Sequence, residues 1–184
     1  NLLHDYGYFN GTVSYKEVSQ KNPKEAKVSY VIDMARPYFL DSIAYLKYPH
    51  YADSLIQSTR SLSVLKSEEN FSVIKLEEER QRLSNLLRNH GYYYYRPEFT
   101  TYRADTLQKS GYVSLQVLPR NGIPAEAKKQ YYIGNTSVYL TGYDNEPPTD
   151  TLRLRTMTFY YSGKKPGIRP NALMRNVFFR KGEL

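Results

Sequence analysis

The stretch LEEERQRLSNLLRNHGYYYYRPEFTTY, residues 76–102, decides the fold of this chain. Its first half carries leucines with helical spacing, at positions that share one face: Leu76, Leu83, Leu86 and Leu87. Gly91 follows as the residue that ends the helix in a left-handed turn, which glycine adopts without steric cost. The tyrosine-rich segment after it favours a strand. The stretch therefore predicts a helix, a glycine stop and an aromatic strand.

Three consecutive glutamates, Glu77, Glu78 and Glu79, fall near the start of the predicted helix, and Arg88 falls near its end. Both placements favour the helix dipole. Successive helical residues are rotated by about 100°, so three consecutive carboxylates do not converge on one substrate atom. We expect the three glutamates to lie in the first turn of the helix with their carboxylates exposed to solvent.

The same unit occurs twice. Residues 1–9 read NLLHDYGYF and residues 85–93 read NLLRNHGYY, so Asn, Leu, Leu, Gly and Tyr match at an offset of 84 residues, the distance from Gly7 to Gly91. Repeats of this kind indicate a modular architecture. A pattern of alternating apolar residues, typical of a half-buried strand, follows each copy. These residues are Val28, Tyr30 and Ile32 after the first copy, and Val113, Leu115 and Val117 after the second.

The remaining segments complete a strand, helix, helix, strand, strand unit of roughly 80 to 90 residues. Its first strand is expected at residues 38–46, and its first helix is expected to begin with Asp53 as the cap. Residues 151–161 alternate like one further strand, and Pro170 suits the first turn of a helix. We predict an α+β chain of tandem β-α-α-β-β repeats, each a small mixed sheet with two helices on one face. Residues 1–36 would be the C-terminal half of a repeat, 37–129 a complete repeat, and 130–184 the N-terminal half of a further one.

Composition excludes some functions. The chain of 184 residues has 20 tyrosines, no cysteine and a net charge of +8, with lysine and arginine dispersed. The absence of cysteine rules out disulfides and thiolate metal sites. The positive charge suits either anionic partners or a solvated basic surface. No segment approaches the roughly 18 apolar residues of a membrane-spanning helix. Because residues 1–3 already match a helix end, we expect a fragment of a longer protein.

No catalytic or metal-binding pattern is present. The histidines, His4, His50 and His90, lack convergent partners at ligand spacing, and two of them lie near helix C-termini, where a partly protonated imidazole is mildly stabilising. The glycines are scattered as turn residues and form no phosphate-binding loop. We expect no enzymatic activity, no cofactor and no metal.

The tandem unit resembles the POTRA domain, which forms the periplasmic arm of outer-membrane assembly proteins of the BamA and TamA type. The tyrosine content is most similar to that of the lipoprotein-anchored TamL group. The matching residues of the complete unit are Leu83, Leu86, Leu87, Gly91, Tyr92 and Tyr93, and those of the first half-unit are Leu2, Leu3, Gly7, Tyr8 and Phe9. The resemblance implies a non-enzymatic scaffold in the periplasm of a Gram-negative cell. It also implies unfolded outer-membrane protein clients, partner proteins of the periplasm or inner membrane, and membrane attachment only through a barrel or lipid anchor outside this chain.

The aromatic segment 92–102 is the predicted partner-binding site. The second strand of a POTRA domain lies at the sheet edge, where an extended client strand can pair with its backbone. Pro97 removes one donor from this edge. We expect Tyr93, Tyr95 and Phe99 to pack on the helices and Tyr92, Tyr94 and Tyr102 to cover the outer face. The predicted binding residues are Tyr92, Tyr94, Arg96, Glu98, Thr100 and Tyr102.

Two other functions fit the composition. A nucleic-acid-binding α/β module would stack bases on exposed tyrosines and hold phosphates with lysine and arginine, although no RNP-type motif is present. A cell-surface repeat that binds polysaccharide would use the same tyrosines. The half-units require completion, and we expect them to pack on the central unit, to complement one another between chains, or to be completed by residues outside this sequence.

Overall fold

The computed structural model describes residues 2–19, 24–141 and 147–184, and the chain divides into two compact units, Asn1–Lys128 and Lys129–Leu184. The first unit contains α1 (Leu2–Asp5), β1 (Thr12–Ser19), β2 (Ala26–Asp33), β3 (Phe39–Tyr45), α2 (His50–Ser58), η1 (Arg60–Leu62), α3 (Val73–Asn89), η2 (Pro97–Phe99), β4 (Thr100–Asp105), β5 (Tyr112–Pro119) and η3 (Ala125–Lys128). The second contains β6 (Thr136–Leu140), β7 (Asp150–Leu154), β8 (Met157–Tyr161) and α4 (Pro170–Met174).

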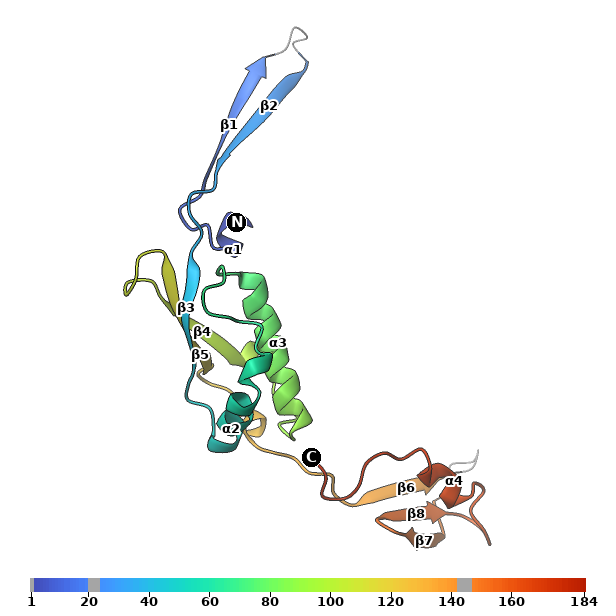
Figure 1. Ribbon diagram of the computed structural model, residues 1–184. Coiled ribbons are helices and arrows are strands. Elements are labelled where there is room, and N and C mark those ends of the chain that lie inside the picture. Colours follow the sequence, from blue (N-terminus) through green and yellow to red (C-terminus); the bar gives the residue numbers. More distant parts are fainter. Residues whose placement is uncertain (1, 20–23, 142–146) are drawn as a thin grey trace. The chain divides into compact units, whose positions relative to one another are not determined.

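The central part of the first unit has the predicted order of strand, helix, helix, strand, strand. Its sheet has the strand order β3-β5-β4, with β3 parallel and β4 antiparallel to β5. Both α2 and α3 lie on one face of this sheet (Figure 1). The α+β fold with a small mixed sheet is therefore confirmed.

The core lies between α3 and the covered face of the sheet. Leu83 and Leu87 of α3 are buried with Val113, Leu115 and Val117 of β5, which confirms both the helical and the alternating apolar patterns. Burying an aliphatic side chain of this size stabilises a fold by about 1.5–3 kcal/mol.

The start of α3 differs from the prediction. The helix begins at Val73, with the hydroxyl of Ser72, its N-cap, accepting the N–H of Lys75 at 3.5 Å. The glutamates therefore lie in the second turn, and the first turn holds no acidic residue. Glu79 is fully buried, so the expectation of three solvated carboxylates is wrong for this residue. Its spacing from Leu76 and Leu83 places it on the apolar face of the helix.

Glu79 is the centre of a buried polar network that joins three elements. Its carboxylate accepts the Tyr45 hydroxyl at 2.6 Å, the backbone N–H of Val64 at 3.1 Å, and two guanidinium N–H groups of Arg82 at 2.9 and 2.6 Å. Burial, together with the hydrogen bond to Glu79, raises the pKa of Tyr45 to about 12. Because a buried charge is tolerated only when it is paired and hydrogen-bonded, this network fixes α3 against β3 and the segment after η1.

The start of α2 also differs from the prediction. Pro49, not Asp53, occupies the N-cap position, and it makes no side-chain capping bond. The N–H of Asp53 already bonds to the carbonyl of Pro49 at 2.8 Å, inside the first turn. Proline suits this boundary because its φ is fixed near the value found here, −55°.

The internal repeat extends to individual hydrogen bonds. At the end of α3, the N–H of Gly91 (φ +89°) donates to the carbonyl of Arg88 at 3.2 Å, and the N–H of Tyr92 donates to the carbonyl of Leu87 at 3.0 Å. At the end of α1, the equivalent backbone bonds join the N–H of Gly7 (φ +85°) to the carbonyl of His4 at 3.0 Å and the N–H of Tyr8 to the carbonyl of Leu3 at 2.9 Å. This pair of bonds is the Schellman motif, in which a left-handed residue closes the last turn of a helix. The predicted glycine stop is confirmed at both positions.

The first junction contacts the central domain directly. The carbonyl of Gly7 accepts the N–H of Tyr38 at 2.9 Å. The ring of Phe9 lies 5.1 Å from that of Tyr38 and 5.2 Å from that of Phe71. A Cβ atom on Gly7 would lie 2.8 Å from the Phe71 carbonyl oxygen. Glycine is required here both for its positive φ and for this close approach.

We therefore expect Gly7→Ala to destabilise the first unit more than Gly111→Ala does. Both residues have positive φ, but a Cβ on Gly111 would meet no atom within 4 Å. The left-handed conformation alone costs an alanine roughly 1–2 kcal/mol, and overpacking at Gly7 adds roughly 1–3 kcal/mol. Urea unfolding of the two variants measures the difference. Equal losses of unfolding free energy would contradict the close packing at Gly7.

β1 and β2 form a two-stranded antiparallel ribbon with one apolar face. The register pairs Val13 with Ile32, Tyr15 with Tyr30 and Glu17 with Val28. Paired residues share a face, and the five apolar side chains of this face are between 44% and 69% exposed. A ribbon of two strands is at best marginally stable in water, so this face is suited to contact with another element.

The second unit has a sheet of the order β6-β8-β7, with β6 parallel and β7 antiparallel to β8. Strand order and directions repeat those of the central sheet. The prediction of one strand over residues 151–161 is wrong, because Arg155 adopts a left-handed φ of 53° and the segment forms the β7–β8 hairpin. Met157 and Phe159 are its buried residues. The predicted helix start at Pro170 is confirmed in α4.

Candidate protein-binding edge strand

The aromatic segment does not form one strand. Tyr95 donates its N–H to the carbonyl of Tyr92 at 2.9 Å, which makes a turn directly after the glycine stop. Pro97 then begins η2, and β4 starts only at Thr100. The prediction of a strand beginning at residue 92 is therefore wrong. The closing turn of α3 leads straight into a second turn, and proline, without an N–H, suits the first position of the short helix that follows.

The turn also changes which tyrosines are buried. Tyr92 and Tyr95 are only 4% and 5% exposed, whereas Tyr93 is 63% and Tyr94 is 49% exposed. Ser84 of α3 donates its hydroxyl to the carbonyl of Tyr95 at 3.4 Å, which ties the turn to the helix. The expected burial of Tyr95 is correct, and Tyr94 is exposed as expected, although it lies in a turn and not on a face of the sheet. The expected positions of Tyr92 and Tyr93 are wrong, because a turn does not alternate its side chains as a strand does.

Tyr102 also packs inward and not on the outer face. Its hydroxyl donates to the carbonyl of Leu76 in α3 at 2.6 Å, and the guanidinium of Arg80 lies 5.2 Å from the centre of its ring. Burial of the ring, followed by the charge of Glu79, raises the pKa of Tyr102 above its ordinary value of 10.0. This side chain holds β4 against α3 and keeps the strand in register with the core.

The six predicted binding residues fall into two groups. Thr100 and Tyr102 belong to β4, where Thr100 is buried and Tyr102 is half-buried. The other four precede the strand. Of these, Tyr92 is buried, and Tyr94, Arg96 and Glu98 are exposed. Of the six, Tyr102 is the one that can take part in strand pairing through its backbone, because the N–H of Thr100 already bonds to the carbonyl of Pro97.

β4 is an edge strand, and its register shows which backbone groups face outward. The N–H of Arg120 bonds to the carbonyl of Phe99 at 2.7 Å, one step before the β4–β5 ladder. In an antiparallel pair, bonded and non-bonded residue pairs alternate. The N–H and C=O groups of every second residue of β4 therefore point away from β5: those of Thr100, Tyr102 and Ala104. The N–H of Thr100 already bonds to the carbonyl of Pro97, and Thr100 is buried, so Tyr102 and Ala104 are the residues whose outward backbone groups are open to pairing. The carbonyl of Val117, opposite Tyr102, correspondingly accepts the N–H of Leu46 on the other side of β5, at 3.0 Å.

The opposite edge of the sheet, β3, is covered. The N–H of Leu40 bonds to the carbonyl of Glu69 at 2.8 Å, and the carbonyl of Leu40 accepts the N–H of Glu68 at 2.7 Å. The N–H of Phe71 bonds to the carbonyl of Tyr38 at 2.8 Å. All of these bonds are between backbone groups. Further along, the guanidinium of Arg60 donates to the carbonyl of Ile43 at 2.8 Å. Within the described ranges, no strand pairs with the outer side of β4. The two edges therefore differ, and β4 is the one that offers a backbone template.

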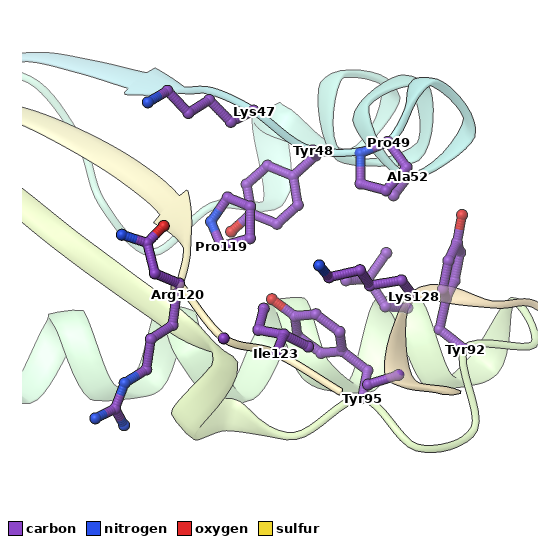
Figure 2. Close-up of a pocket in the computed structure, with 14 residues that line it drawn as sticks. Lys47, Tyr48, Pro49, Ala52, Tyr92, Tyr95, Pro119, Arg120, Ile123 and Lys128 are labelled. Atoms are coloured by element: carbon purple, nitrogen blue, oxygen red, sulfur yellow. The ribbon is translucent and has the colours of Figure 1, made fainter. Parts of the chain in front are cut away.

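The sequence-based reasoning missed a cavity of about 280 Å³ beside this turn. It is lined by residues of α2, α3 and the segment after β5, with the rings of Tyr48, Tyr92 and Tyr95 around it (Figure 2). No local pattern in the sequence marks it, because its walls come from segments far apart along the chain.

Among residues 2–19, 24–141 and 147–184, no group of three or more histidine, aspartate or glutamate side chains is placed to hold a metal ion. In the same ranges, no helix combines the length and the apolar character needed to cross a membrane.

No protein-family model matches the chain, and no curated protein does. Solved structures do. The chain is similar to POTRA domains 3–5 of Haemophilus influenzae BamA, with 10% identity and a TM-score of 0.47, over 99% of this chain and 58% of that one. It is also similar to POTRA domains 1–3 of the periplasmic domain of Omp85 from Anabaena, with 14% identity and a TM-score of 0.29, over 97% of this chain and 60% of that one. The chain thus spans less than two thirds of the length of either protein.

Proposed function

We propose that this chain is part of a periplasmic, non-enzymatic scaffold of an outer-membrane assembly factor, and that it binds extended client strands along the open edge of β4. The observation that carries this proposal is the difference between the two sheet edges. β3 is covered by residues 68–71 and by Arg60, whereas Tyr102 and Ala104 direct open backbone donors and acceptors outward. Pairing through the backbone is largely independent of client sequence, which suits a protein that handles many β-rich clients.

The strength of such binding follows from the number of bonds. Each outward residue offers one N–H and one C=O, and each net hydrogen bond contributes about 0.5–1.5 kcal/mol. Weak, reversible pairing is therefore expected, as a scaffold that passes clients on requires. The side chains of Thr101 and Arg103, which point to the uncovered face of the sheet, would add contacts without demanding one client sequence.

The same proposal includes the repeat organisation. Residues 37–129 would be a complete POTRA-like repeat, residues 1–36 the end of a preceding one, and residues 130–184 the beginning of a further one with the β7–β8 hairpin inserted. The exposed apolar face of the β1–β2 ribbon supports this, because its residues correspond to the buried Val113, Leu115 and Val117 of the complete repeat. Partner proteins of the periplasm or inner membrane, and attachment through a barrel or lipid anchor of a longer protein, belong to the same proposal.

Ala104→Pro tests the edge-strand mechanism. The substitution removes an outward N–H without removing a bond between β4 and β5, and proline is tolerated on sheet edges. We expect it to weaken binding of a roughly ten-residue peptide with alternating apolar and polar residues, the pattern of a membrane β-strand, by about two- to tenfold, the effect of losing one net hydrogen bond. The measurement is an NMR titration of the whole chain that follows backbone amide shifts over β4.

Ala104→Val is the matched control, because it keeps the N–H and suits a strand; binding should persist. If both variants bind the peptide like the original chain, or if the shifts occur away from β4, the edge-strand mechanism is wrong. The proposed fold would be unaffected by that result.

A second candidate function, nucleic-acid binding, rests on one observation in the second unit. The rings of Tyr139 and Tyr160 are stacked 4.7 Å apart, and a cavity of about 490 Å³ beside Tyr160 is lined by Arg153, Arg155 and Lys181. A binding constant for single-stranded nucleic acid that falls steeply with salt concentration would favour this candidate.

A further inference from the structure

One face of the second sheet is polar and carries side chains from all three of its strands. Thr158 of β8 pairs with Ser137 of β6 on one side and with Arg153 of β7 on the other. Residues paired across strands share a face, and side chains alternate between the two faces along each strand. Tyr160, two residues beyond Thr158, therefore lies on the same face, whereas the buried residues of β8 lie on the opposite one.

A cavity of about 490 Å³ lies on this polar face, and three cationic side chains line it: Arg153, Arg155 and Lys181. The residues that line it include no acid. None of the three cations forms an ion pair within the described part of the chain. Like charges around one space repel each other, so the cavity suits an anion.

Backbone features bring two of these cations to the cavity. Arg155 is the first residue of the two-residue β7–β8 turn and has a left-handed φ of 53°. Glycine or asparagine is preferred at such a position, so the arginine is kept there against the preference of the backbone. Lys181 is distant from β6 in sequence, but the N–H of Gly182 donates to the carbonyl of Ile133 at 2.8 Å, and the N–H of Ile133 donates to the carbonyl of Glu183 at 2.8 Å. These two bonds hold Lys181 beside the start of β6.

The aromatic side of the cavity is held by ring stacking. The rings of Tyr139 and Tyr160 are stacked, with their centres 4.7 Å and their planes 10° apart. Of this pair, Tyr160 lines the cavity. Asn135, Ser137 and Thr158 also line it. Their amide and hydroxyl groups supply hydrogen-bond donors in addition to the positive charge.

We infer that this cavity binds a phosphate monoester. Arg153, Arg155 and Lys181 would balance its charge of nearly −2, and the guanidinium groups would donate paired hydrogen bonds to the phosphate oxygens. A volume of about 490 Å³ lies within the usual range of small-molecule sites, about 300–1,000 Å³, and leaves room for an organic group beside Tyr160. Soluble phosphate esters and lipid headgroups that end in a phosphate share this chemistry.

This inference does not depend on strand pairing at β4, because every residue that lines the cavity belongs to the second unit. Binding at the cavity and binding at the edge can therefore be present or absent independently. The nucleic-acid candidate uses the same cavity but a different ligand, since each phosphodiester carries one negative charge. Preference for a monoester over a diester separates the two.

The test titrates the whole chain with glycerol 3-phosphate at about pH 8 and low ionic strength, where the monoester is a dianion and screening is weak. Diethyl phosphate, a diester with a single charge, is the comparison ligand. We expect glycerol 3-phosphate to bind with a millimolar Kd and to shift the backbone NMR signals of Ser137 and Thr158. It should bind about tenfold more tightly than diethyl phosphate.

Arg155→Gly removes one cation from the cavity without disturbing the turn, because glycine adopts a positive φ without steric cost. It should weaken binding of glycerol 3-phosphate by about three- to tenfold, the effect of one contact to the phosphate, and Lys181→Gln should do the same. Lys164 is an exposed cation of the same unit that does not line the cavity, and Lys164→Gln should leave binding unchanged. The amide spectrum of each variant without ligand should show β6, β7 and β8 intact.

Vesicles distinguish the two sources of the phosphate. Binding to phosphatidylcholine vesicles only when they contain phosphatidic acid assigns the site to lipid headgroups, and binding of glycerol 3-phosphate without vesicle binding assigns it to soluble esters. The inference is overturned if glycerol 3-phosphate does not bind, if it binds no more tightly than diethyl phosphate, or if Arg155→Gly leaves its binding unchanged. An oligothymidylate without a terminal phosphate that binds more tightly than glycerol 3-phosphate would also overturn it, and would assign the cavity to nucleic acid.

Discussion

Glu79→Ala is expected to destabilise the first unit by about 3–5 kcal/mol, the cost of breaking a buried ion pair by removing one partner. The substitution leaves Arg82 with a partly buried and uncompensated charge, because Glu79 accepts two of its N–H groups at 2.9 and 2.6 Å. It also leaves the N–H of Val64 and the hydroxyl of Tyr45 without their carboxylate acceptor. Urea unfolding followed by circular dichroism measures the loss.

The neighbouring residue supplies the control. Glu78 lies one position earlier in the same helix and is exposed, so Glu78→Ala should change the unfolding free energy by about 0.5 kcal/mol or less. Glu79→Gln keeps the volume and removes the charge, and its loss should lie between the two. A loss below about 1 kcal/mol for Glu79→Ala would show that the network does not hold α3 to β3.

The first unit is also expected to unfold cooperatively as the pH rises from 10 towards 12. The pKa of Tyr45 is raised from 10.0 to about 12, chiefly by burial and then by the Glu79 carboxylate. Below pH 10, folded and unfolded states both keep the proton, so the contribution of this neutral tyrosine is fully present. Above pH 10, the unfolded state loses the proton first and unfolding becomes more favourable. A shift of this size corresponds to roughly 3 kcal/mol, which is fully lost once the pH has passed 12.

Three further tyrosines also lower the free energy of unfolding as the pH rises, because burial raises the pKa of Tyr48, Tyr95 and Tyr102. Tyrosinate absorbance and far-UV circular dichroism, recorded together against pH, check the prediction. The four buried tyrosines should ionise only as the helices unfold. Tyr30→Phe, at a site that is 69% exposed, should leave the alkaline midpoint unchanged. Ionisation of all tyrosines in one step with the helices intact would contradict the prediction.

The open edge and the cavity occupy opposite ends of one short segment, residues 92–105, and α3 positions both. Ser84 holds the turn at Tyr95, and the carbonyl of Leu76 holds Tyr102 in β4. Because these two bonds come from the same rigid helix, the Glu79 network that anchors α3 also determines how precisely the edge is presented. Glu79→Ala therefore tests the network that holds α3 behind the site, and Ala104→Pro tests the edge of β4 that binds the peptide.

The sequence alone determined the features that depend on local geometry. Leucines at helical spacing followed by glycine specify a helix that ends at a residue with positive φ. The identical residues around Gly7 and Gly91 predict the same hydrogen bonds at both positions. Alternation at Val113, Leu115 and Val117 specifies a strand with one buried face. From these elements the strand, helix, helix, strand, strand order of the central domain follows, because each pattern reports a period of the backbone and not a contact.

Only the tertiary structure decided which tyrosines are buried, which sheet edge is open and which segments enclose the cavity beside Tyr48. Four consecutive tyrosines, residues 92–95, carry no alternation, so their pattern does not distinguish a turn from a strand. The burial of Glu79 depends on Tyr45, Val64 and Arg82 meeting its carboxylate, although its spacing from Leu83 already placed it on the apolar face. The coverage of β3 by residues 68–71 and the walls of the Tyr48 cavity join segments far apart in the chain. Such contacts are selected by packing of the whole domain, and no local period encodes them.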